Sequence, residues 1–245
     1  TQQTYKPGKL TIATGQPAYE PWVMNDKPES GEGYEAAVAY AVADKLGFKK
    51  SDVVWTRTAF DTAIAPGAKD WDFNIQQFGI TDERKKAVDF SSSYYNDSQS
   101  VVVKKDSKFA NATKVSDLKD ATVGVMVGTL AYDYAKANIK DDIQTFNDDA
   151  ALAQALDAGQ IDALVTSTVE CVYMVQSEQV KDAKVLGRLP DSEDKSGMGI
   201  VLPKDSKLTA AVTKAVDDLN ADGTIKKLQD KWLAEYTTDL TELKK

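Results

Sequence analysis

The alternation of strand and helix begins in residues 10–47, which read LTIATGQPAYEPWVMNDKPESGEGYEAAVAYAVADKLG. Leu10 to Thr14 is a short apolar run, which is typical of a buried strand. From Tyr34 onward the apolar residues recur at helical spacing and stop at Gly47, a residue type common just beyond a helix C-terminus. A strand followed by an amphipathic helix is the unit from which helix-covered parallel sheets are built.

The same unit recurs along the rest of the chain. Further strands are predicted at 53–56 and 72–76, and Thr81 is predicted to cap a short helix. A second series follows the polar residues 91–100. It comprises strands at 122–126 and 161–165, helices that open at Gly128-Thr129 and at Ser167, and two closing helices capped by Ser206 and Thr224.

The two series predict an α/β protein with two lobes, each a mixed, mostly parallel sheet flanked by helices. We expect residues 1–97 to begin the first lobe, 98–196 to form the second, and 197–245 to return to the first with the C-terminal helices. The apolar runs 101–103 and 198–202 are expected to cross between the lobes. Two such crossings form a hinge.

The composition excludes several classes of function. The formal charge of −8, from 38 acidic and 30 basic residues, disfavours nucleic acid and anionic membranes as partners. No run approaches the roughly 18 to 20 apolar residues of a membrane span, and no apolar signal segment begins the chain, so we expect a mature, soluble product. Histidine is absent and Cys171 is alone, which excludes Cys/His metal sites and Ser-His or Cys-His catalytic pairs. We therefore expect no cofactor and no metal, and a buried, inert Cys171.

Five segments, in order along the chain, carry a family resemblance. The most distinctive is residues 79–91, GITDERKKAVDFS, followed by Tyr94-Tyr95. The others are Tyr19-Glu20-Pro21-Trp22, Gly33-Tyr34-Glu35, Val123-Gly124-Val125 with Gly128-Thr129, and Asp222-Gly223-Thr224 with Trp232-Leu233. Over nearly its whole length the chain resembles the type II periplasmic binding proteins for polar amino acids, solute-binding protein family 3, which serve ABC importers.

The resemblance implies capture of a small amino acid or related carboxylate by hinge closure, without catalysis, and delivery to the membrane subunits of an ABC importer. It also implies a monomer in the periplasm or at the outer face of the cytoplasmic membrane, and the polar residues 1–6 fit a trimmed lipid-anchored tether. Two alternatives stay open. One is a dehydratase-like enzyme that uses a cleft glutamate as general acid, and the other is a ligand-sensing domain.

Arg84 is the predicted centre of the site. With Thr81 as N-cap, the first-turn N–H groups are free, and Arg84 in the third helical position leans back toward them. A guanidinium holds a carboxylate through two bonds of roughly 1.5 to 3 kcal/mol each. In the family the matching arginine binds the ligand's α-carboxylate. From the residues alone, the alternative is that Arg84 pairs within the charged run 82–86.

Other residues complete the predicted site. Gly128 and Thr129 are expected to supply backbone donors from the second lobe, with an ordinary capped turn as the alternative. Tyr19, Trp22 and Phe60 are expected aromatic walls, with core packing as the alternative. The remaining expected ligand-binding residues are Gln77, Phe78, Gly79, Met126, Ser167 and Glu170.

The end of the site that would bind an ammonium group departs from the family. Family members that bind α-amino acids place an aspartate where this chain has Ser167, and an unpaired buried cation costs about 3 to 5 kcal/mol. Glu170 is near, but Ser167 to Glu170 is a capping-box pattern, which predicts that the glutamate turns back to its own helix. Gly79 replaces the usual serine or threonine, and Gln16 replaces a frequent aspartate.

Three interpretations of the site therefore stay open at this point. The first is a polar amino acid held by carbonyl groups and Glu35 or Glu170, and the second is a carboxylate that lacks the α-ammonium group. The third reading is a deliberately altered binding protein. The absence of an evident anionic partner argues against a strongly cationic ligand such as arginine.

Overall fold

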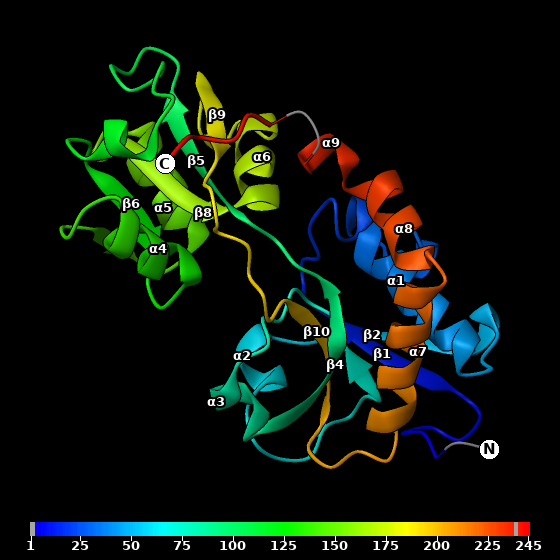
Figure 1. Ribbon diagram of the computed structural model, residues 1–245. Coiled ribbons are helices and arrows are strands. Elements are labelled where there is room, and N and C mark those ends of the chain that lie inside the picture. The colour runs from blue at the N-terminus through cyan, green and yellow to red at the C-terminus, as the bar shows by residue number, and fades with distance from the viewer. Residues whose placement is uncertain (1–2, 238–239) are drawn as a thin grey trace. The chain divides into compact units, whose positions relative to one another are not determined.

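The chain forms two α/β units in the computed structural model, which describes residues 3–237 and 240–245 (Figure 1). Unit 1 comprises Thr1–Asn96 and Lys195–Ala234, and unit 2 comprises Asp97–Asp194 and Glu235–Lys245. The predicted α/β class with two lobes is confirmed, and each unit has a mixed five-stranded sheet flanked by helices. Within the described residues, no helix combines the length and the apolar character needed to cross a bilayer.

The sheet of unit 1 has the strand order β2-β1-β3-β10-β4. Strand β1 runs parallel to its neighbours β2 and β3, whereas β10 is antiparallel to β3 and β4. The strands are β1 (Leu10–Thr14), β2 (Val53–Arg57), β3 (Phe73–Asn74), β4 (Val88–Tyr95) and β10 (Met198–Pro203). Since Thr14 pairs with Arg57 and Ala13 with Asn74, the parallel strands end together at one edge of the sheet.

Helices of two kinds cover this sheet. The long helices α1, α7 and α8 pack against one another, while α2 and α3 are single turns that follow β2 and β3 (Figure 1). The helices are α1 (Tyr34–Lys45), α2 (Phe60–Ala63), α3 (Asp82–Lys85), α7 (Thr209–Ala221), α8 (Thr224–Trp232) and the 3-10 turns η1 (Met24–Asp26), η2 (Pro28–Ser30) and η3 (Lys50–Asp52).

Unit 2 repeats the plan with the strand order β7-β6-β8-β5-β9. Strand β6 is parallel to β7 and β8, and β5 is antiparallel to β8 and β9. The strands are β5 (Gln99–Lys104), β6 (Val123–Met126), β7 (Gln144–Phe146), β8 (Ala163–Ser167) and β9 (Ala183–Arg188); the helices are η4 (Val115–Leu118), α4 (Leu130–Asn138), α5 (Asp149–Asp157), α6 (Thr168–Gln176) and α9 (Ala234–Thr237).

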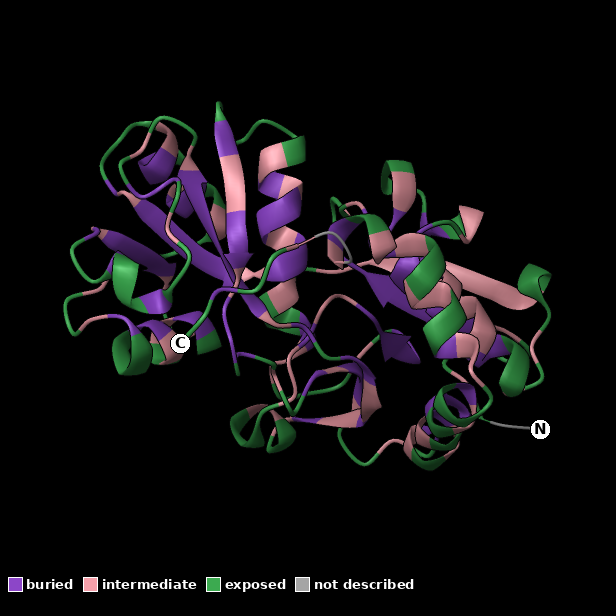
Figure 2. Ribbon diagram, turned by 45° about the horizontal axis from the view of Figure 1, so that its top comes forward, coloured by how far each residue is buried: buried purple, intermediate pink, exposed green. Residues whose placement is uncertain are grey.

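Each unit has its own apolar interior, to which both strands and helices contribute buried residues (Figure 2). In β5, Val101 and Val103 join one core cluster of unit 2 while Val102 joins the cluster on the other face. A strand buried on both faces is a continuous apolar run, as the three valines are. Cys171 is fully buried in the second of these clusters, where it packs as a small apolar side chain.

Several element boundaries differ from the predicted ones. The run 101–103 lies inside β5 and does not cross between units; the first two crossings follow Asn96 and Asp194. Strand β4 was not predicted, because its SSSYY sequence is polar where the other strands are apolar. The closing helices begin after Leu208 and Gly223, which lie two residues and one residue away from the expected caps.

A third crossing, after Ala234, carries the C-terminal tail into unit 2, whereas the sequence assigned 197–245 to the first lobe. The tail is bound there by backbone hydrogen bonds. The N–H of Leu243 donates to the Arg188 carbonyl at 2.8 Å, and the N–H of Val115 donates to the Lys244 carbonyl at 2.9 Å. The Leu243 side chain is buried in the core of unit 2. Its burial is the physical reason why the tail leaves unit 1.

Candidate ligand-binding site

A cavity of about 210 Å³ lies in unit 1 where β1 and β3 end. Crevices at the carboxyl ends of parallel strands are the usual ligand positions in α/β sheets. Three of the predicted site residues, Tyr19, Phe60 and Gln77, meet in its wall, and Tyr19 is 54% exposed, so its ring is available to a ligand. The full lining consists of Thr14, Gly15, Pro17, Ala18, Tyr19, Phe60, Gln76 and Gln77.

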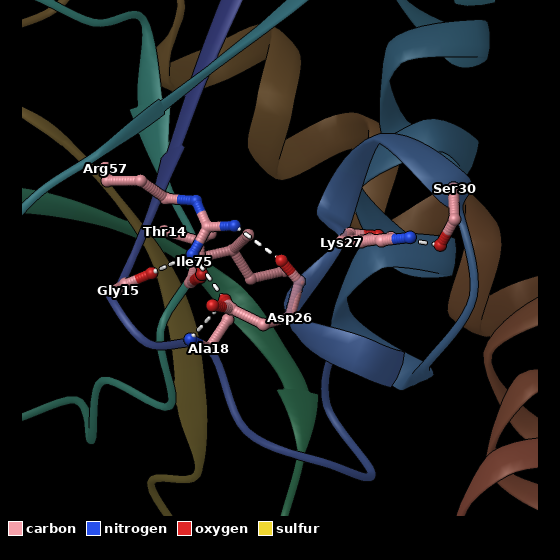
Figure 3. Close-up of polar contacts among 8 residues, drawn as sticks. All are labelled: Thr14, Gly15, Ala18, Asp26, Lys27, Ser30, Arg57 and Ile75. Carbon is pink, nitrogen blue, oxygen red and sulfur yellow. Dashed lines mark hydrogen bonds and ion pairs between the residues drawn. The ribbon is translucent and has the colours of Figure 1, made fainter.

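Arg57 and Asp26 bind the loop that precedes Tyr19. Figure 3 shows their contacts with Gly15 and Ala18. The Arg57 guanidinium, at the end of β2, donates to the Gly15 carbonyl at 2.9 Å and to Asp26 Oδ1 at 2.6 Å. Its second nitrogen donates to the Asp26 carbonyl at 2.7 Å, and the N–H of Ala18 donates to Asp26 Oδ1 at 2.8 Å. The bonds from Ala18 and Arg57 lower the pKa of the Asp26 carboxyl. One ion pair therefore binds both ends of the loop segment that faces the cavity.

Sequence reasoning missed this pair. Arg57 and Asp26 lie 31 positions apart, in segments that share no motif. Asp26 also has a left-handed backbone conformation, with φ 54°, and no neighbouring residue type predicts this conformation. Only the pairing of β1 with β2 brings the Arg57 side chain to the loop that follows β1.

Gln77 is held from behind by Glu35, which is fully buried at the start of α1. The Gln77 backbone N–H donates to Glu35 Oε2 at 2.8 Å, and its side-chain amide donates to Glu35 Oε1. The Tyr94 hydroxyl donates to Glu35 as well. These bonds maintain the positive φ of 50° at Gln77, an unfavourable conformation for a residue with a side chain. Glu35 thus shapes the cavity wall, and its oxygens are already used within the protein.

Burial raises the pKa of Glu35 to about 6, although the hydrogen bonds from Tyr94 and Gln77 work in the opposite direction. Desolvation disfavours the charged form, and the donors recover only part of that cost. The same burial, together with the adjacent Glu35 charge, raises the pKa of Tyr94 well above its usual value. Glu35 is therefore a buried titratable group directly behind the cavity.

Arg84 lies beside the cavity through its contact with Phe60. The guanidinium carbon is 5.4 Å from the centre of the Phe60 ring, and Nη1 donates to the Gly79 carbonyl at 2.8 Å. Within residues 3–237 and 240–245, Arg84 has no carboxylate partner. The predicted alternative, pairing within the run 82–86, is not found there: Lys86 pairs with Glu83 instead. Partial burial lowers the pKa of Arg84, which nevertheless stays cationic.

Thr81 and Gly79 shape the surroundings of this arginine. Thr81 caps α3, as predicted: its hydroxyl accepts the N–H of Arg84 at 3.1 Å. A Cβ at Gly79 would lie 3.5 Å from Arg84 Nη1, an ordinary contact. The serine or threonine usual in the family would fit beside the guanidinium, so Gly79 removes a hydroxyl and leaves the arginine more open.

Two predicted aromatic residues belong to the core. Trp22 is 5% exposed and packs edge-on against Tyr34 and Tyr95, with ring centres 6.1 and 5.7 Å away. Phe78 is fully buried and lies behind Phe60, with ring centres 4.7 Å apart. Trp22 is therefore not a wall of this cavity, and Phe78 supports a wall without forming one. Large rings bury more apolar area inside a unit than at its surface, which explains both positions.

In unit 2, Thr129 caps α4, since its hydroxyl accepts the N–H of Tyr132 at 3.3 Å and donates to the carbonyl of Met126 at 2.7 Å. The single hydroxyl proton is thus used within the protein. Gly128 is exposed, has φ 71°, and has no atom within 4 Å of where a Cβ would stand. Any ligand contact here would come from the backbone amides at the open N-terminus of α4.

The predicted capping box at the start of α6 is wrong. Ser167 makes no cap hydrogen bond. The first turn is instead bound by the preceding segment: the Thr168 N–H donates to the Ser98 carbonyl at 2.8 Å, and the Val169 N–H donates to Asp97 Oδ2 at 3.4 Å. Glu170 is therefore not turned back onto its own helix start.

Glu170 is partly buried beside two other acids, Asp149 and Asp97. Burial and the charges of these two acids raise the pKa of Glu170 to about 7. Burial also raises the pKa of Asp149. The sequence offered no sign of this cluster, because its members lie far apart in the chain, in α5, in α6 and in the loop between β4 and β5. Among the described residues no set of His, Cys, Asp and Glu side chains is arranged to hold a metal ion.

The chain matches the family model of the bacterial extracellular solute-binding proteins, family 3, over residues 10–235. The chain belongs to this family. It is 30% identical to the L-cystine-binding protein TcyJ of Escherichia coli, over 90% of this chain and 81% of that protein. It is 29% identical to an L-arginine-binding protein of Pseudomonas aeruginosa, over 94% of this chain and 88% of that protein.

The fold of this solute-binding protein is also similar to a solved structure, that of an ancestral arginine-binding protein bound to arginine. The TM-score is 0.67 and the identity is 31%, over 92% of this chain and 98% of the other. The family membership predicted from the five sequence segments is thereby confirmed.

We predict that Arg57→Met loosens the cavity wall of this solute-binding protein. Loss of the bonds to Gly15 and Asp26 leaves the Ala18 N–H with a poorly oriented acceptor. Amide exchange in the segment 15–26 should become about 10 to 100 times faster, the range expected for one or two charged hydrogen bonds. Hydrogen–deuterium exchange with mass spectrometry measures this. Lys226→Met, which removes an exposed ion pair in α8, is the matched control; unchanged exchange in 15–26 of Arg57→Met would contradict the role of the pair.

We also predict that the protein gains stability as the pH falls from about 7.5 to 5. Because the folded-state pKa values of Glu35 and Glu170 lie near 6 and 7, above the 4.5 of the free side chain, the folded state binds protons first in this window. The shift at Glu35 alone corresponds to about 2 kcal/mol. This contribution is complete below pH 4.5 and is lost as the pH rises through 6. Urea unfolding at both pH values measures the gain. Glu35→Gln should reduce it by about 1 kcal/mol, because the rest of the shift is expressed only below pH 5, and an undiminished gain would refute the assignment.

Proposed function

We propose that this solute-binding protein binds an amino acid whose carboxylate is held by Arg84, and that it delivers the ligand to the membrane subunits of an ABC importer. The observation that carries the proposal is the Arg84 guanidinium itself, which is partly buried, lies on Phe60, and has no carboxylate partner among the described residues. A partly desolvated cation without a counter-ion is a strong receptor for an anion.

The geometry of Arg84 favours a carboxylate over a single-atom anion. Nη1 already donates to the Gly79 carbonyl, which fixes the plane of the guanidinium. The remaining donors of the planar fork match the two oxygens of a carboxylate. Phe60 offers an apolar face beside this position and leads into the cavity walled by Tyr19 and Gln77. A ligand with a carboxylate next to a short organic chain suits both features.

Glu170 supports a ligand that also carries positive charge. The raised pKa of this carboxyl follows from burial and from Asp149 and Asp97, and a nearby cation would lower it again with a gain in binding free energy. The sequence argument against a cationic ligand depended on the absence of an anionic partner, and the proposal assigns this part to Glu170. The named relatives bind arginine and cystine, both of which carry α-ammonium groups.

The proposal includes the backbone amides of Gly128 and Thr129 as a second set of donors for the ligand's carboxylate, brought to it by hinge closure. Three N–H groups at a helix start favour an anion. It also includes a monomeric protein at the outer face of the cytoplasmic membrane or in the periplasm. Binding, without turnover, is the proposed activity.

The alternative enzymatic function is favoured by one observation, the pKa of about 7 at Glu170, which suits a general acid. The two functions differ in the fate of the ligand. A binding protein returns the amino acid unchanged after prolonged incubation and denaturation, whereas a dehydratase-like enzyme returns a product with altered mass.

We predict that Arg84→Ala weakens amino-acid binding by at least about 100-fold, because two charge-assisted hydrogen bonds are lost. The melting temperature of the ligand-free protein should change little, since Arg84 pairs with no carboxylate of the described residues. A thermal-shift screen against the twenty amino acids identifies the ligand, because stabilisation follows ligand concentration over dissociation constant. Isothermal titration then gives the affinities.

Lys86→Ala is the matched control. Lys86 lies two residues further along the same charged run, and its side chain is 75% exposed, so binding should stay within about twofold of the wild type. Wild-type affinity in Arg84→Ala would refute the proposed carboxylate site. Equal losses in both variants would point to general electrostatic attraction in place of a specific contact.

A further inference from the structure

Gln76 is a cavity-lining residue to which no motif assigns a role. Its side-chain carbonyl oxygen, Oε1, is shielded from water and accepts no hydrogen bond from the described part of the chain. Its neighbours in the wall are committed: the Thr14 hydroxyl donates to the Ile75 carbonyl at 2.8 Å, and the Gln77 amide donates to Glu35. Gln76 therefore lines the cavity with a side chain whose carbonyl oxygen has no donor.

A buried acceptor without a partner destabilises the protein, and such groups are rare in native structures. A donor brought by a ligand would remove that cost. The final torsion of a glutamine side chain has a broad energy profile, so the Gln76 amide can turn toward a ligand without movement of the backbone. Binding would then recover a hydrogen bond that the empty protein lacks.

The position of the Gln76 amide is set by Gly15. A Cβ on Gly15 would lie 2.5 Å from Gln76 Nε2 and 2.9 Å from its Cδ, so the amide packs directly over the glycine backbone at the end of β1. Any larger residue at position 15 would displace the amide. Gly15 and Gln76 belong to different segments. They approach each other only because β1 pairs with β3.

The cavity edge that carries Gln76 is linked to the carboxylate position through Phe60. The Phe60 ring both lines the cavity and stacks with the Arg84 guanidinium, 5.4 Å away. An N–H donor within the cavity and close to a carboxylate on Arg84 is, in an amino acid, the α-ammonium group. Position 167, which carries an aspartate in family members that bind this group, is Ser167 here, and a hydroxyl supplies no charge.

We propose that Gln76 accepts a hydrogen bond from the α-ammonium group of the bound amino acid and thereby selects ligands that carry this group. The inference rests on the proposed carboxylate site at Arg84. An ammonium group has three donors, so Gln76 acts as its neutral acceptor in unit 1 and leaves the charge to be balanced elsewhere. The ligand class is an α-amino acid, and simple carboxylic acids of the same chain length bind more weakly.

The test compares two probes on each variant by isothermal titration. For L-arginine the pair is L-arginine and 5-guanidinopentanoic acid, which is the same chain without the α-amino group; if the thermal-shift screen ranks L-glutamine higher, the pair is L-glutamine and 4-carbamoylbutanoic acid. Gln76→Met, which keeps the length and removes the amide, should weaken binding of the amino acid about 10- to 100-fold. Binding of the deaminated probe should change less than about twofold.

Two further variants separate an altered fold from an altered contact. Gln76→Glu keeps an acceptor at the same place and should bind the amino acid at least as tightly as the wild type, while Gly15→Ala should displace the amide and resemble Gln76→Met. The melting temperature of each ligand-free variant is measured alongside. Equal affinities of Gln76→Met and wild type for the amino acid, or equal losses for both probes, would overturn the inference.

The outcome for Gln76 is distinct from that for the carboxylate site. If Arg84→Ala loses the amino acid and Gln76→Met does not, the carboxylate site stands and the role of Gln76 falls. If the wild type binds neither probe of a pair and no amino acid in the screen, the proposed function itself fails, and the inference fails with it.

Discussion

The guanidinium of Arg84 lies on the ring of Phe60 and donates to the Gly79 carbonyl, and no carboxylate of the described residues neutralises it. An arginine on a protein surface usually pairs with a nearby acid or extends into water. Here the acid neighbours of the charged run are exposed and Lys86 pairs with Glu83, so Arg84 has no carboxylate partner among the described residues. The short helix that carries it begins at the Thr81 cap, which orients the first turn.

The cavity beside this charge is maintained by polar groups that are themselves buried or paired. Glu35 holds Gln77 in a left-handed conformation, and the Arg57–Asp26 pair holds the Tyr19 loop. Both arrangements cost stability: the first buries a carboxyl whose pKa rises to about 6, and the second fixes a non-glycine residue at positive φ. A wall that the protein itself fixes loses less entropy when a ligand arrives, which is the usual benefit of such arrangements.

The sequence predicted the class of fold and the Thr81 cap, because these depend on local patterns. The apolar run at Leu10, the helical spacing after Tyr34, and the Thr81 cap are each read within a dozen residues. Sequence-based prediction failed where contacts between residues distant in the chain determine the local structure. The serine-rich β4 forms a strand because β10 pairs with it, and Ser167 is not a cap because Asp97 and Ser98 bind the first turn of α6. Trp22 was misjudged for the same reason, since its partners Tyr34 and Tyr95 are remote in sequence.

The central claim is that Arg84 recognises the two oxygens of a carboxylate. The most direct measurement is the affinity of the wild-type protein for its amino acid and for the corresponding α-carboxamide, which replaces one oxygen with a donor nitrogen and removes the negative charge. With L-arginine and L-argininamide as the pair, isothermal titration should give a dissociation constant at least about 100-fold higher for the amide. Equal dissociation constants would contradict the account, because an unpaired guanidinium would then have no part in holding the ligand.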